Sequence, residues 1–218
     1  LPYDQIPLLI VIIGFAFLIL VQNLSEEEQK EACGYIYSEG KRLQNLSLKL
    51  MNLLVLKNQE FQMKKQNLVP MIHEVISSMQ YRLQEQKILV NLNLKPTICE
   101  VEADLLKSLI LNLVDNSLKS MNVGGILTIE CCPAQEGAKI YVSDTGCGMP
   151  KGELDKITEA FYRVDKSRSR KQGGVGLGLA LCKEIVRIHK GDMEFISQEE
   201  KGTTAIITIG GGHYEKTD

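Results

Sequence analysis

The sequence lacks the residue patterns that identify several common classes of enzyme and binding protein. Its only histidines are His73, His189 and His213, and their spacing supports no Ser-His-Asp or Cys-His arrangement, so we expect structural or surface roles for them. The six cysteines show no metal-ligand spacing, and the adjacent pair Cys131 and Cys132 cannot easily bridge itself. This cysteine usage favours a reducing cytosol.

An excess of one charge is also missing. The formal net charge is -2 and the pI is about 6.0, so the chain has no overall basic field and nucleic acid is not an expected partner. No internal repeat or low-complexity stretch is present. The 218 residues exceed one typical domain, and a hydrophobic content of 44% is enough for a real core.

Two glycine-rich turns are present in the C-terminal half. The first spans residues 144–149 (DTGCGM), and the second spans residues 173–179 (GGVGLGL) and opens a helical pattern. An acid in one such turn can bind a base, and backbone N–H groups at a helix N-terminus can bind phosphates. Upstream, Asn112, Asn116 and Lys119 share one stripe of a predicted helix, which forms a polar ridge suited to a metal and phosphates.

Five motifs follow one another in an order that resembles the ATP-binding domain of bacterial sensor histidine kinases. They are Asn112-x-x-x-Asn116, Asp144-x-Gly-x-Gly, Phe161, the glycine run and Gly202-Thr203-Thr204. Any one of them is weak, since short glycine patterns recur by chance, but five in this order are strong. The resemblance covers roughly residues 68 to 210.

The resemblance implies a role for each site residue. Asp144 would accept a hydrogen bond from the exocyclic amine of adenine, and Thr203 would join it through a shared water. Asn116 would be the Mg²⁺ ligand, with Asn112 and Lys119 in contact with phosphate or metal-bound water. The other implied ATP-binding residues near the glycine turns are Gly146, Gly148, Gly174, Val175, Gly176, Leu177 and Gly178. The ordinary alternatives are a turn-capping aspartate and helix-surface amides.

The segment 161–171 is too polar and basic to be core after Phe161. A long loop inside a compact domain is usually functional. By resemblance this loop is the ATP lid, with Phe161 as an apolar latch. The other lid residues expected at the ATP site are Tyr162, Arg163, Lys166 and Arg168. A solvated run of charge is the alternative for any single basic residue.

The run from Ile6 to Val21 contains no charged side chain and has three possible explanations. A membrane helix is possible but marginally short, because about 20 residues are usually needed to cross a bilayer. A secretory signal is the weakest explanation, because residues 1–5 lack a basic side chain and no small-residue cleavage site follows. The third explanation is a helix buried in a bundle.

A second helix is predicted directly after this run. Residues 25–28 (SEEE) form a capping box, and the apolar spacing continues to about Leu56 in two stripes, which suits a bundle core. The two helices then form a hairpin, and two chains form a four-helix bundle, a homodimer through residues 6–56. A monomeric hairpin packed on its own α/β domain is the alternative.

This hairpin resembles the dimerisation and phosphotransfer module of the same kinases, except in its first helix. In the family that helix starts with a phosphoacceptor histidine, an acid and, a few residues on, a proline; here these positions fall at about Tyr3, Asp4 and Pro7. Either the first helix has been replaced or altered, or its residues are not the natural ones, or a membrane helix is joined to the second helix. In each case self-phosphorylation on the usual histidine is not expected.

The predicted fold class is α+β. A helical hairpin at residues 1–57 precedes a linker at 58–67, an ATP-binding domain at 68–212 and a tail at 213–218. Within the ATP-binding domain, helices at about 70–86, 103–121 and 177–189 would cover one face of a mixed sheet, which makes a two-layer α/β sandwich.

The leading hypothesis is a histidine-kinase core that uses Mg-ATP for phosphoryl transfer to a histidine in two-component signalling. Its expected partner is a response regulator receiver domain, and its expected place is the cytoplasmic part of a membrane-bound bacterial sensor. A nucleotide-binding pseudokinase or interaction module is the alternative. The chaperone, topoisomerase and mismatch-repair ATPases place a further domain after the ATP site; this chain stops soon after Ile209, which argues against them.

Overall fold

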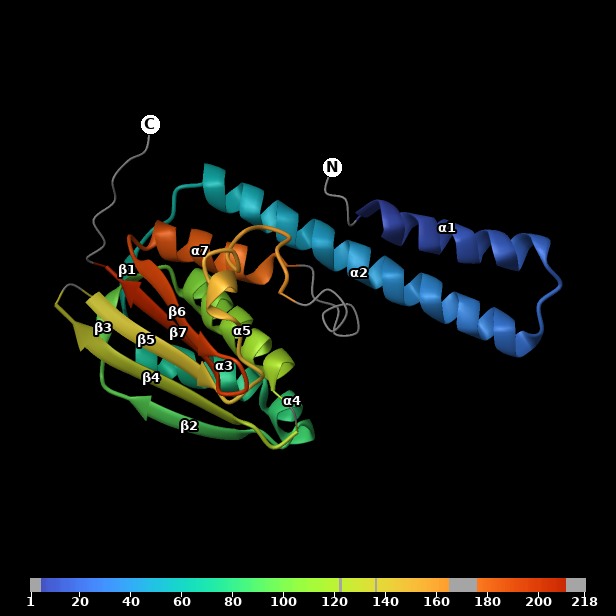
Figure 1. Cartoon of the computed structure of the whole chain (residues 1–218). Helices are drawn as coiled ribbons and strands as arrows, with labels where there is room; N and C mark the ends of the chain where they lie inside the picture. Colours follow the sequence, from blue (N-terminus) through green and yellow to red (C-terminus); the bar gives the residue numbers. More distant parts are fainter. Residues whose placement is uncertain (1–4, 122, 136, 165–175, 211–218) are drawn as a thin grey trace. The chain divides into compact units, whose positions relative to one another are not determined.

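The computed structural model describes residues 5–121, 123–135, 137–164 and 176–210. The chain divides into two compact units, Leu1–Asn52 and Leu53–Asp218, which are treated separately below. Figure 1 traces the helices of the first unit and the sheet and helices of the second.

The first unit contains two helices joined by a short turn, as the sequence predicts. Helix α1 spans Gln5–Val21 and helix α2 spans Glu26–Asn58, so α2 continues past the boundary between the units. The capping box is formed, since the backbone N–H of Ser25 donates to Glu28 Oε2 at 2.9 Å. Among the described residues, no helix combines the length and the apolar character that a membrane span requires.

After the last turns of α2, the second unit contains a small antiparallel ribbon, of which one strand and the pairing are not predicted from the sequence. Strand β1 (Lys64–Asn67) lies within the predicted linker and pairs with β3 (Ile98–Val101). The sequence of β1 is KKQN, which has no apolar alternation, so its pairing rests on backbone hydrogen bonds and leaves no periodic signal.

The predicted helix at residues 70–86 is in fact two helices. Helix α3 spans Leu68–Ser78 and begins at an Asn67 cap, whose side chain accepts from the Val69 N–H. Helix α4 spans Gln80–Glu85. The break falls at Met79, which leaves the helical conformation with φ -100° and ψ 1°, although no Gly or Pro marks it in the sequence.

The main sheet has five strands in the order β2-β4-β5-β7-β6. Strands β2 and β4 are parallel, and the other neighbours are antiparallel. The five strands are Leu89–Leu94 (β2), Ile126–Ala134 (β4), Gly137–Asp144 (β5), Asp192–Gln198 (β6) and Gly202–Ile209 (β7). The remaining elements are α5 (Ala103–Ser120), the short 3-10 helix η1 (Lys151–Glu153) and α7 (Gly178–Ile188).

Helices α3, α5 and α7 cover one face of this sheet (Figure 1), which confirms the predicted α+β fold with a two-layer sandwich. In β5, every second residue is buried, and this inward set ends with Asp144. The register then places Asp144 opposite Thr203 on β7 and Leu127 on β4. The alternation that builds the core therefore also turns a carboxylate toward the helices.

His189 joins the end of α7 to the start of α5. Its Nδ1 lies 2.8 Å from the carbonyl oxygen of Ile185, and its Nε2 accepts from the backbone N–H of Glu102 at 3.0 Å. Burial lowers the pKa of His189 below its ordinary value, which suits a neutral ring with one accepting nitrogen. His189 therefore has a structural role, as the sequence predicts. Of the other two histidines, His73 is exposed and His213 lies outside the described residues.

Candidate functional site

Asp144 is buried at the end of β5, and its carboxylate is held by three donors. Its Oδ1 accepts from the Gly146 N–H at 2.9 Å, from the Ser120 hydroxyl at 3.0 Å and from the Thr203 N–H at 3.3 Å. These hydrogen bonds offset the cost of burying a carboxylate. Within the part of the chain that the structure describes, Oδ1 accepts all three hydrogen bonds and Oδ2 accepts none.

The glycine turn after Asp144 is fixed from two sides. The Cys147 N–H donates to the carbonyl of Ser120 at 3.1 Å, and the Glu200 N–H donates to the carbonyl of Cys147 at 2.7 Å. Gly148 has φ +62°, and a Cβ added there would lie 1.9 Å from the carbonyl oxygen of Gln198. Only glycine fits this position, so the turn that follows Asp144 requires it.

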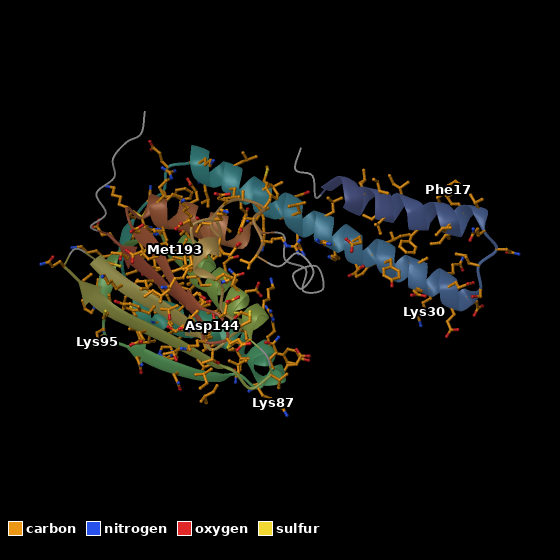
Figure 2. All side chains as sticks on the ribbon, viewed as in Figure 1. Phe17, Lys30, Lys87, Lys95, Asp144 and Met193 are labelled. Atoms are coloured by element: carbon orange, nitrogen blue, oxygen red, sulfur yellow. The ribbon has the colours of Figure 1, made fainter. Side chains whose placement is uncertain are left out.

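A cavity of about 740 Å³ opens in front of Asp144. Its polar lining includes Asn116, Lys119, Asp144 and Thr203. Its apolar lining includes Leu113, Val142, Met149, Leu179, Phe195 and Ala205. An apolar cavity with a few convergent polar groups is typical of a small-molecule site, and this volume lies within the usual range of about 300 to 1,000 Å³. Figure 2 shows Asp144 near the end of its strand, where α5 passes.

The polar ridge of α5 meets the start of α7. A Cβ built on Gly178 would lie 3.4 Å from Asn112 Oδ1 and 3.8 Å from the amide of Asn116. The residue before Gly178 is Leu177, whose apolar side chain cannot cap the first N–H groups of the helix. Since Leu177 provides no side-chain cap, this helix start suits an anion beside the two side-chain amides.

Lys119 makes an ion pair that the sequence analysis missed. Its Nζ lies 2.6 Å from one carboxylate oxygen of Asp115, and Arg82 Nη1 lies 2.7 Å from the other. Burial raises the pKa of Asp115, but the two cations outweigh it and hold the pKa below its ordinary value. Lys119 thus lines the cavity from a fixed position on α5.

The segment predicted to be the ATP lid begins with two contacts that the motif alone does not reveal. Phe161 adopts φ +70°, and its N–H donates to the carbonyl of Gly176 at 2.8 Å, which closes the two ends of the loop on each other. The Tyr162 hydroxyl donates to the carboxylate of Glu153. Arg163 is half-buried. The predicted ATP contacts Lys166, Arg168, Gly174 and Val175 lie outside the described residues, as does Tyr3.

The structure therefore brings together Asn112, Asn116, Lys119, Asp144, Gly146, Gly148, Gly178 and Thr203, which the sequence analysis named from separate motifs. The structure adds Ser120, which lines the same cavity and belongs to none of the five motifs. The sequence does hold one indication of this position. Ser120 follows Asn116 by four residues, so the two side chains lie on the same face of α5.

The comparison with protein families shows which family this site belongs to. The profile of the family described as histidine kinase-, DNA gyrase B- and HSP90-like ATPase matches residues 101–211. The chain belongs to this family. The match begins in β3 and covers α5, both glycine turns and the last strand, so it includes every element that lines the cavity.

The similar proteins of this ATPase family are bacterial sensor histidine kinases, which confirms the resemblance. Sensor histidine kinase WalK of Bacillus subtilis is 39% identical over 128 residues, which cover 58% of this chain and 21% of WalK. Sensor protein SrrB of Staphylococcus aureus is 29% identical over 188 residues, which cover 84% of this chain and 32% of SrrB. The chain thus spans about a fifth to a third of these relatives.

Solved structures of histidine kinases share the fold over nearly the whole chain. Acinetobacter baumannii histidine kinase AdeS has a TM-score of 0.74 at 18% identity and covers 97% of this chain, with 98% of that chain covered in return. Histidine kinase ThkA in complex with response regulator protein TrrA has a TM-score of 0.78 at 19% identity, covering 95% of this chain and 59% of that one.

Proposed function

We propose that this chain is the ATP-binding core of a sensor histidine kinase and that its cavity holds Mg-ATP for phosphoryl transfer to a histidine. The observation that carries the proposal is the convergence of three groups on one cavity. A carboxylate with one oxygen that accepts no hydrogen bond from the described residues, the amide of Asn116 with Asn112 beside it, and the start of α7 suit an amine-bearing base, a metal and phosphates respectively.

The chain's own residues have separate tasks in this proposal. Asp144 Oδ2 accepts from the exocyclic amine of adenine, and the apolar lining of the cavity covers the base. The N-terminal N–H groups of α7 and the ammonium of Lys119 hold the phosphates. Phosphoryl transfer depends mainly on such positioning and charge neutralisation.

The amides of α5 fit a hard divalent cation. Because Asn112 Nδ2 donates to the carbonyl of Ser108 at 2.8 Å, its Oδ1 is the atom left on the side of Gly178. Asn116 lines the cavity and offers a second amide oxygen. Mg²⁺ takes few protein ligands and completes its shell with waters and phosphate oxygens, and when bound it neutralises phosphate charge. We assign Asn116 as its ligand.

The phosphoacceptor is the part of this proposal that the chain does not supply. No histidine occurs before His73, and the family's acceptor position falls at about Tyr3. We therefore propose that the chain transfers phosphate only to an acceptor histidine on another chain. The same fact favours a second candidate, a pseudokinase that binds nucleotide and acts as an interaction module.

One pair of measurements separates these two functions. Titration calorimetry should give Mg-ATP and ADP dissociation constants in the micromolar to millimolar range, with GTP much weaker. Labelled ATP should then be incubated with the chain alone and with a partner chain that carries an intact acceptor histidine. Label on the partner supports the kinase, and binding without transfer supports the interaction module. Acid-labile phosphate on this chain alone, or equal affinity for ATP and GTP, would contradict the assignments.

The first unit supports a further part of the proposal, a homodimer through residues 6–56. Many apolar side chains of α1 are exposed, including Ile10 (63%), Phe17 (61%) and Leu20 (83%). In α2, Leu48 and Met51 are also more than half exposed. Pairing across a two-fold axis would bury this surface in a four-helix bundle. Light scattering without detergent should give twice the chain mass, and a monomer would rule the dimer out.

The remaining parts of the proposal concern the setting of the molecule. By likeness to the sensor kinases, we propose a response regulator receiver domain as its partner and the cytoplasmic side of a membrane-bound bacterial sensor as its place. A binding assay with purified receiver domains tests the first. Fractionation of the cells that contain the parent protein tests the second.

A further inference from the structure

We propose that Ser120 is a positioning residue for adenine recognition: its hydroxyl orients the carboxylate of Asp144 so that Oδ2 faces the base. This inference rests on the proposed function, because it concerns how the ATP site distinguishes its base. Neither glycine motif contains Ser120, which lies at the last position of α5. It is the one side-chain donor among the three groups that reach Oδ1 within the described chain.

The contact between Ser120 and Asp144 is built into the backbone. The carbonyl of Ser120 accepts from the Cys147 N–H at 3.1 Å, so the end of α5 is attached directly to the glycine turn. This attachment sets the distance between the Ser120 hydroxyl and the Asp144 carboxylate. The hydroxyl oxygen lies 3.0 Å from Oδ1, a normal hydrogen-bond distance.

Gly146 leaves the space that this contact needs. A Cβ added at Gly146 would lie 2.1 Å from Ser120 Oγ and 2.7 Å from Asp144 Oδ1. Any larger residue would therefore displace the hydroxyl, the carboxylate or both. The glycine is thus required by the close approach of two side chains.

The arrangement makes the two oxygens of the carboxylate different. Rotation of the carboxylate would exchange Oδ1 and Oδ2, and three donors on one side oppose that rotation. Without the hydroxyl, the N–H groups of Gly146 and Thr203 remain, the second at a longer 3.3 Å. We therefore expect Ser120→Ala to loosen the carboxylate without releasing it. Because the hydroxyl acts on ATP only through the carboxylate that it orients, we expect a loss of about 3- to 10-fold in affinity for ATP, which is smaller than the loss of a direct hydrogen bond to a charged acceptor.

A purely structural role for Ser120 makes a different prediction. The hydroxyl also lies 2.9 Å from the carbonyl of Ser117, a local contact that serine often makes in helices. One hydroxyl has one proton, which the two acceptors must share. If only the contact with Ser117 mattered, removing the hydroxyl would affect every nucleotide alike, because nothing about it would depend on the amine of the base.

The test compares ATP with purine riboside triphosphate, which carries hydrogen in place of the amine. Calorimetry on the full chain with Mg²⁺ should show that Ser120→Ala weakens ATP about 3- to 10-fold and the amine-free analogue less than about 2-fold. Ser108→Ala is the matched control, since it makes the same change three turns earlier on α5 and keeps the carbonyl that Asn112 uses. Thermal melting checks that all variants are folded.

Each outcome decides the inference. A lower ratio of ATP to analogue affinity in Ser120→Ala, with Ser108→Ala unchanged, supports it. An equal loss for both nucleotides, or no loss for ATP, overturns it while leaving the proposed function intact. Failure of the unmodified chain to prefer ATP over the analogue would instead overturn the proposed function, because the role of Asp144 would be gone.

Discussion

Replacing Asp144 by asparagine should weaken ATP binding with little effect on the fold. Asparagine keeps an acceptor at Oδ1, so the donors from Gly146, Thr203 and Ser120 stay satisfied. At the second position an NH₂ group replaces Oδ2, and this donor would face the adenine amine. The loss is one hydrogen bond to a charged acceptor, about 1.5 to 3 kcal/mol, or roughly 10- to 150-fold in the dissociation constant.

Titration calorimetry of Asp144→Asn with Mg-ATP measures this loss directly. Asp104→Asn is a matched control, because it makes the same chemical change on the exposed first turn of α5. Circular dichroism should show both variants folded. A folded Asp144→Asn protein that binds ATP within about 2-fold of the unmodified chain would refute the reasoning, since Oδ2 would then have no part in binding.

Two further predictions concern the metal and the pH dependence of stability. Asn116→Ala should abolish the Mg²⁺ dependence of ATP binding, while the circular dichroism spectrum stays unchanged. If the Mg²⁺ dependence is also unchanged, Asn116 is not a metal ligand but an ordinary amide on the helix surface. Because burial lowers the pKa of His189 in the folded chain, the unfolded chain binds its proton more tightly, so the free energy of unfolding should fall as the pH drops below about 6.5. Urea unfolding at several pH values measures this, and His189→Gln should reduce the dependence; an identical dependence in the variant would contradict it.

Much of the fold could be predicted because apolar spacing reports burial. The expected helix at 103–121 is observed as Ala103–Ser120, and the expected mixed sheet is observed, with every second residue of β5 buried. Strand β1 could not be found in this way, since its polar side chains carry no periodicity. The parallel pairing of β2 with β4 also has no signature within either strand, because it depends on contacts between distant segments.

The candidate site was predictable as far as its residues belong to motifs. Asp144 and Asn116 were named because glycine turns and helical spacing point to them, and the structure places both at one cavity. Ser120 and Arg82 could not be predicted in this way, because each makes its contact with a residue far away in the sequence. Ser120 contacts Asp144, and Arg82 contacts Asp115. A serine or an arginine on a helix is too common for its sequence position alone to indicate such a contact.

The most direct test of the central claim is a crystal structure of the chain with Mg²⁺ and a non-hydrolysable ATP analogue. The account predicts the adenine amine about 2.7 to 3.2 Å from Asp144 Oδ2, a metal ion ligated by Asn116 Oδ1, and phosphates at the N-terminus of α7. A nucleotide seated elsewhere, for example in the neighbouring cavity lined by Lys151, Ile196 and Lys201, would contradict it. So would a base in the predicted cavity with its amine turned away from Asp144.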